Sequence, residues 1–249
     1  MASLLFQPAE LLKELSALQV LAARFVDSQS DYKLCELTDE IEGLRARGGT
    51  LTLEIPKERP LKTRVSRGEF EPPHKKSAQR VYGLITGIWE IEAAEHQVQH
   101  PKRPNKKTSP TMLIGFTGKA STVFRVKDEQ SEETVACWKM ELGDANSPGC
   151  FFHTFASTDH RFPVPRHPNV FATPMSAIGF ALGELFQDAW ERTVSGTTHA
   201  PNQWRSIQTQ RFQAILRWQL NQVEKTNSSP WCSLKLAKPD DTLFLKSPP

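Results

Sequence analysis

The sequence predicts an α+β protein built on a central, mostly antiparallel sheet of about four to five strands. Residues 80–157 alternate apolar and polar side chains in segments joined by short polar loops, which indicates a strand meander. Helical periodicities precede and follow this region. Apolar residues occur on both faces of the expected strands, so we expect helices or a partner to cover much of the sheet.

The first part of the chain predicts a helical hairpin. Apolar side chains recur every three or four positions in residues 8–26, and residues 34–44 repeat the pattern before Gly48–Gly49 end it. A short alternating strand is expected at residues 50–55. Residues 1–56 therefore form the expected N-terminal unit.

The remainder divides into a linker, a body and a tail. Residues 57–79 are basic and contain prolines, which is typical of a linker, and residues 80–225 form the α+β body. Two C-terminal helices are expected to pack on the sheet. The second, about residues 203–225, carries a broad apolar arc, so we expect it to be buried on much of its surface. The sequence predicts an irregular tail at residues 226–249.

Charge and cysteine usage limit the classes of function. The balance of 31 Lys and Arg against 28 Asp and Glu gives a net charge of only +3. This argues against nucleic-acid binding over the whole surface but permits local basic patches. No apolar run approaches the roughly 20 residues of a membrane span, and four scattered cysteines predict free thiols in a reducing compartment. We expect a soluble, cytoplasmic protein without membrane contact.

The common catalytic and cofactor motifs are missing from the sequence. It contains no GxSxG elbow, no glycine-rich nucleotide loop and no CxxC pair. The histidines are scattered, so we expect no metal and no cofactor. Cys150 lies three residues before His153, but positions three apart in a strand point to opposite faces. Catalytic activity stays an open question, and the sequence favours its absence.

One enzymatic alternative is a Mg²⁺-dependent nuclease. Nucleases of the restriction type place carboxylates and a lysine on adjacent strands, where they hold the metal and activate water. The chain has Lys139-Met140-Glu141, the reverse of the usual Glu-x-Lys order. The residues of this alternative are Glu90, Asp128, Lys139 and Glu141.

Two basic loops indicate possible contact with the backbone of DNA or RNA. They lie in residues 57–80 and 102–107, and neutralised phosphates would release counterions. Few aromatic residues accompany them, so base stacking is not indicated. The candidate residues are Lys62, Arg64, Arg67, Lys75, Lys76, Lys102, Arg103, Lys106 and Lys107.

The element order also resembles the ubiquitin-conjugating (E2-like) fold over about residues 80–225. A helix, a four-stranded meander and a crossing with His167-Pro168-Asn169 precede two helices. In that family the catalytic cysteine follows shortly after His-Pro-Asn. Here the next cysteine is Cys232, more than sixty residues later. The resemblance therefore implies a catalytically silent E2-like interaction domain.

The leading hypothesis is a non-enzymatic binding or adaptor subunit of a multi-protein assembly. The sheet and helices would form its scaffold, and the basic loops, the proline-rich crossing and the N-terminal hairpin would contact a protein partner. Tryptophans anchor both cores and interfaces, and we expect these to serve the core first. They are Trp89, Trp138, Trp190, Trp204 and Trp218.

Overall fold

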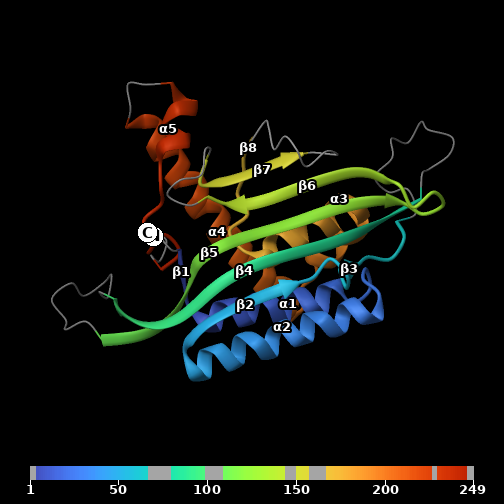
Figure 1. The fold of residues 1–249 in the computed structure, drawn as a ribbon, viewed down its shortest axis with the longest axis horizontal. Coiled ribbons are helices and arrows are strands. Elements are labelled where there is room, and N and C mark those ends of the chain that lie inside the picture. The colour runs from blue at the N-terminus through green and yellow to red at the C-terminus, as the bar shows by residue number, and fades with distance from the viewer. Residues whose placement is uncertain are drawn as a thin grey trace.

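The computed structural model is an α+β fold in which helices cover one face of an antiparallel sheet (Figure 1). It describes residues 4–66, 80–98, 109–143, 150–156, 167–225 and 229–245. The helices are α1 (Pro8–Ala22), α2 (Ser28–Arg47), α3 (Pro174–Val194), α4 (His199–Glu224) and α5 (Pro230–Leu236). The strands are β1 (Leu5–Phe6), β2 (Gly49–Ile55), β3 (Leu61–Lys62), β4 (Val81–Val98), β5 (Ser109–Asp128), β6 (Thr134–Leu142), β7 (Phe152–Ala156) and β8 (His167–Pro168).

Over the described residues the sheet has eight strands in place of the expected four to five, within the predicted fold class. Its main order is β2-β4-β5-β6-β7-β8, with β1 added beside β5 and β3 beside β4. The extra strands β1, β3 and β8 span two residues each, too few for an alternating pattern to be visible in the sequence. The expected meander corresponds to β4 through β7.

The expected N-terminal hairpin is confirmed by α1 and α2, which lie along the β2 side of the sheet (Figure 1). The side chain of Asp27 accepts a hydrogen bond from the Ser30 backbone at 2.8 Å and so caps the start of α2. Gly48 ends this helix in a left-handed conformation with φ 69°. Leu15, Leu18 and Ile41 are almost fully buried on the facing sides.

Helix α3 covers the centre of the sheet. Thr173 and Ser176 form a reciprocal capping box at its start, and Pro174 occupies the first turn. Ile178, Leu182 and Leu185 are buried against the strands, and the five tryptophans expected in the core are buried or half-buried. Gln187, with φ 31°, kinks the helix.

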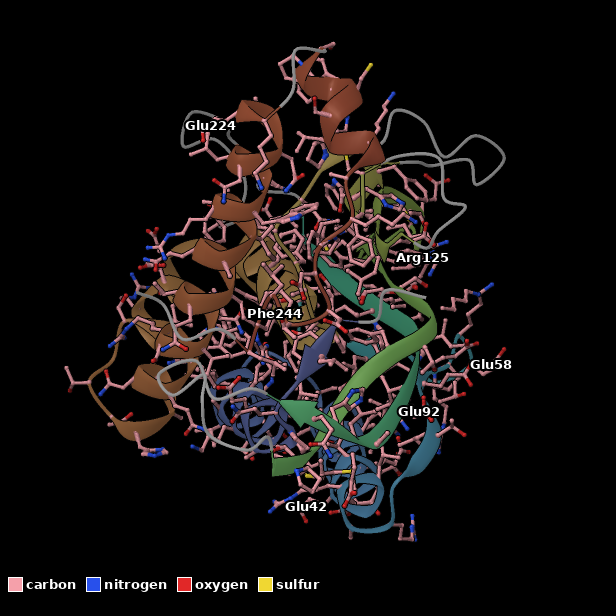
Figure 2. The ribbon with its side chains drawn as sticks, turned by 90° about the vertical axis from the view of Figure 1, so that its left-hand side faces the viewer. Glu42, Glu58, Glu92, Arg125, Glu224 and Phe244 are labelled. Carbon is pink, nitrogen blue, oxygen red and sulfur yellow. The ribbon has the colours of Figure 1, made fainter. Side chains whose placement is uncertain are left out.

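Helix α4 packs on α1 and α3, and the segment after it folds back across the molecule. The region expected to be an irregular tail contains α5 and a run of turns at residues 241–245. The Leu5 backbone donates to the Asp241 carbonyl at 2.8 Å, and the Phe6 and Phe244 rings stack at 5.1 Å. Figure 2 shows Phe244 between α4 and the sheet.

Candidate functional site

Most of the candidate phosphate-binding residues lie outside the described part of the chain. Lys62 and Arg64 are within it. The Lys62 ammonium lies 4.5 Å from the centroid of the Tyr82 ring, and Arg64 Nε donates to the Val26 carbonyl at 3.0 Å. The others, which lie outside the described residues, are Arg67, Lys75, Lys76, Lys102, Arg103, Lys106 and Lys107. Nucleic-acid contact therefore stays a prediction.

Of the four residues of the nuclease alternative, the structure places Lys139 and Glu141 side by side. Asp128 lies at the far end of β5, where its Oδ1 accepts hydrogen bonds from the Gln130 and Ser131 backbones and holds the turn. Glu141 pairs with Ser121, seven positions from Asp128. At about 3.3 Å per residue, the two carboxylates are roughly 23 Å apart along the sheet.

Glu90 also lies apart from Lys139 and Glu141. It lies on β4 at the bulge between Trp89 and Ile91, and β5 separates it from the strand of Glu141. Its Oε2 accepts a hydrogen bond from the Lys119 backbone at 3.0 Å. This hydrogen bond ties the Glu90 carboxylate to the β5 backbone, and the nuclease stays an untested prediction.

Glu141 also contacts His153, which was not among the predicted site residues. Glu141 on β6 and His153 on β7 are directly opposite each other. The Lys139 ammonium forms an ion pair with Glu141, and His153 Nε2 lies 3.4 Å from Glu141 Oε2. His153 Nδ1 lies 2.9 Å from the Cys150 carbonyl. Side chains alternate between the two faces of a strand, so aligning the predicted strands of Glu141 and His153 could have placed these two residues opposite each other.

The electrostatics of this cluster hold Glu141 in its ionised form. Burial alone would raise its pKa, but the hydrogen bonds from His153 and Lys139 outweigh that effect and lower the pKa to about 2. An ionised carboxylate that contacts a lysine ammonium and a histidine ring is a stable acceptor and a poor general acid or base. The arrangement therefore fits a structural tie between β6 and β7.

This low pKa predicts an acid-sensitive contribution to stability. Because the folded pKa lies below the unfolded value, the unfolded chain binds the proton first as the pH falls, so the contribution is present above about pH 5 and lost toward about pH 2. Glu141→Gln should remove up to about 3 kcal/mol at neutral pH. Urea unfolding at pH 7 and pH 3 should show the gap between wild type and variant shrinking; a gap of constant size would contradict it.

Two of the four cysteines, Cys137 and Cys150, are buried. Burial raises the pKa of the Cys150 thiol, and the thiol of Cys137 is shifted in the same direction by the same cause. All four cysteines are free thiols, as expected.

Among the described residues, no three His, Cys, Asp or Glu side chains are grouped as metal ligands would be. Likewise, not one described helix combines the length and hydropathy of a membrane span.

The His-Pro-Asn tripeptide that carries the E2-like resemblance is part of the sheet edge. His167 and Pro168 form β8, and Asn169 is 7% exposed. The Asn169 side chain donates to Thr154 Oγ1 at 3.2 Å and accepts from the Phe171 backbone at 3.0 Å. Cys232 is exposed on α5. These contacts give the asparagine a structural role at the turn that leads into α3.

Three exposed apolar side chains follow one another along α4, where the sequence predicted burial. The broad arc of this helix predicted burial, yet Phe212, Leu216 and Leu220 are 46%, 43% and 57% exposed. Trp204 and Ile215, on the adjacent side of α4, are buried. Residues four apart share one face of a helix, so the three exposed side chains form a continuous row. We call them the α4 stripe.

Beside the α4 stripe lies a cleft between α3 and α4 with a volume of about 270 Å³. Its walls are aromatic: the Phe171 and Phe180 rings are 4.8 Å apart, and those of Trp190 and Trp204 are 6.4 Å apart. Phe212 lines the same cleft. The stripe and the cleft therefore form one apolar surface, and apolar surfaces of this kind mark interaction sites on soluble proteins.

Two glycines of α3, Gly179 and Gly183, line this cleft. A Cβ atom on Gly179 would lie 2.5 Å from the Trp204 ring, a distance that real Cβ contacts do not show. Gly179→Ala should therefore displace Trp204 and cost about 1–3 kcal/mol of unfolding free energy, as overpacking does. Thermal and urea unfolding would measure this; a stabilised variant would show that Trp204 moves freely.

The cleft carries a carboxylate on its α3 side. Glu184 lines the cleft and is exposed. A partner lying along the α4 stripe would meet this carboxylate with its α3-facing edge, so a basic edge would complement the surface.

Comparisons with protein-family models, with curated proteins and with solved structures found no match to this chain.

Proposed function

We propose that this protein is a non-enzymatic binding or adaptor subunit that recognises an amphipathic helix of another protein. The observation that carries the proposal is the α4 stripe, Phe212, Leu216 and Leu220, together with the aromatic cleft beside it. A helix with apolar side chains every three or four residues can place one in the cleft and others along the stripe. We further propose a cytoplasmic location, which the four free cysteines support.

The occupant is a helix with a basic edge. The exposed carboxylate of Glu184 lines the cleft and favours Lys or Arg on the partner. Most of the binding energy should come from the apolar contacts, because rim charges mainly set orientation and association rate.

A photo-crosslinking amino acid at position 216, introduced into the protein in its host, would test the proposal. The supporting result is a cross-linked peptide from another protein that is amphipathic as a helix and carries Lys or Arg along one edge. That peptide, made synthetically, should bind the wild-type chain and lose about 10–100-fold in affinity to Leu216→Gln. Glu184→Lys should weaken binding further in a salt-dependent way.

The control uses apolar or aromatic residues on other helices that are more exposed than Leu216. Val20 on α1 and Tyr32 on α2 are 66% and 67% exposed. Cross-linking from position 32 should not yield this peptide, and Val20→Gln should leave peptide affinity unchanged. If position 216 captures only a second copy of this chain, or an extended peptide without helical periodicity, the proposed partner class is wrong.

A further inference from the structure

The outer edge of β2 presents backbone hydrogen-bonding groups to the solvent. This strand is the last one on its side of the sheet, and Figure 1 shows it along the sheet border. All seven of its residues pair with β4 in continuous register. Within the described part of the chain, these residues make no hydrogen bond other than those of the β4 ladder. An open edge of this kind is a template for a further strand.

The pairing of β4 shows which residues of β2 direct their backbone groups outward. The Gly83 carbonyl of β4 accepts a hydrogen bond from the Thr63 backbone at 2.9 Å, on the side of β4 where β3 and β2 lie. Every second residue of a strand directs its N–H and C=O to the same side, so the odd-numbered residues of β4 face β2. They are directly opposite the odd-numbered residues of β2. The N–H and C=O groups of Thr50, Thr52 and Glu54 therefore point away from β4.

Other parts of the sheet border are closed. In β3, the Lys62 backbone donates to Ser30 Oγ at 2.6 Å, and its carbonyl accepts from the Asp27 backbone at 3.1 Å. At the opposite border, β8 is two residues long and contains Pro168, which has no N–H to donate. By contrast, β2 is seven residues long and regular. A long, regular edge is the part of a sheet that most readily accepts another strand.

The charge beside this edge indicates which strand would fit. Every charged side chain of β2 and of the β4 residues paired with it is a carboxylate: Glu54, Glu90 and Glu92. Glu92 is directly opposite Thr50, and Glu90 is directly opposite Thr52, so the three carboxylates lie on one face of the sheet. A strand with Lys or Arg on this face would complement them, whereas a second copy of β2 would bring another Glu54.

We propose that the β2 edge binds an extended segment of another protein, which adds to the sheet as an antiparallel strand and carries Lys or Arg at alternate residues. Backbone hydrogen bonds to Thr50, Thr52 and Glu54 supply affinity, and the basic side chains give selectivity. The edge is separate from the α4 stripe, because Glu224 at the end of α4 and Glu92 beside β2 lie on opposite sides of the molecule in Figure 2. Neither proposal depends on the other.

A capped seven-residue peptide of alternating lysine and valine tests the proposal. Amide hydrogen exchange, followed by nuclear magnetic resonance at low ionic strength, should show fast exchange at Thr50, Thr52 and Glu54 in the free protein and at least about tenfold slower exchange at saturating peptide. A peptide with glutamate in place of lysine should bind at least about tenfold more weakly. If the lysine peptide gives no saturable protection, or protects equally well when its lysine amides are N-methylated, the proposal is overturned.

Variants locate the binding and exclude a second copy. Glu54→Lys should weaken peptide affinity about 3–10-fold, because it replaces an attractive cross-strand pair by a repulsive one. Glu224→Lys makes the same charge change on the other side of the molecule and should leave affinity unchanged. Thr52→Pro removes one outward N–H, which an edge strand can spare, and should also weaken binding. Thermal unfolding checks that each variant is folded, and the N-methylated peptide tests the same hydrogen bonds on the wild-type chain.

Two outcomes would assign the effect elsewhere. Equal losses in Glu54→Lys and Glu224→Lys would show that the peptide responds to net charge alone, and this would overturn the proposal. Protection of Thr50, Thr52 and Glu54 in the free protein that rises with its concentration would assign the edge to a second copy, which would overturn the proposed occupant.

Discussion

Glu14→Leu should lower the free energy of unfolding by about 3–5 kcal/mol, because it leaves Arg211 as an uncompensated buried charge. Glu14 is fully buried and accepts hydrogen bonds from Arg211, from Thr173 Oγ1 at 2.8 Å and from Gln208 Nε2 at 2.6 Å. One carboxylate thus ties α1 to α4 and to the residue that caps α3. Urea unfolding with a two-state fit would measure the loss.

Two further variants show how much of the stability loss in Glu14→Leu comes from the unpaired charge and how much from altered packing. The double variant Glu14→Leu/Arg211→Leu removes both charges and should recover a substantial part of the loss. The ion pair of Arg80 and Glu129 is the surface control, since these side chains are 61% and 32% exposed; Glu129→Gln should cost less than about 1 kcal/mol. A double variant as unstable as the single one would show that shape, and not the unpaired charge, sets the cost.

Phe152→Ala should also cost about 3–5 kcal/mol, the usual range for emptying a buried aromatic site. The Phe152 side chain is fully buried on β7. Its ring meets that of Trp218 at 5.7 Å and that of Phe244 at 6.5 Å, so it joins the sheet to α4 and to the C-terminal segment. Chemical unfolding would give the magnitude, and near-ultraviolet circular dichroism would report the disturbed aromatic packing.

The same substitution on the α4 stripe is the control for Phe152. Phe212 is 46% exposed, so Phe212→Ala should change stability by no more than about 0.5 kcal/mol. A loss of several kcal/mol at Phe212 would show that its ring is part of the core. That outcome would remove the basis of the proposed partner surface as well.

The features that the sequence predicted are those with a local periodic signal. The helical hairpin and the strands β4 to β7 repeat their apolar residues over many positions, so their type was readable. The two-residue strands have no such repeat. For α4, composition could not distinguish the buried Ile215 from the exposed Leu216, because the two are equally apolar and only the position of α1 and α3 separates them.

The two charged clusters differ in how far they were predictable. Glu141 and His153 belong to neighbouring strands, and correct pairing of one hairpin would have placed them together. Glu14 and Arg211 are 197 residues apart in sequence and meet only through the packing of α1 on α4. No local pattern marks such a pair.

The wide separation of Glu14 and Arg211 also has a consequence for how the chain matures on the ribosome. At translation rates of about 5–20 residues per second, roughly 10–40 s pass between the synthesis of Glu14 and that of its counter-ion. During that interval α1 can pair with α2, but its carboxylate has no guanidinium to meet. The nascent hairpin must therefore keep this face of α1 hydrated, and its docking must wait for the last third of the polypeptide.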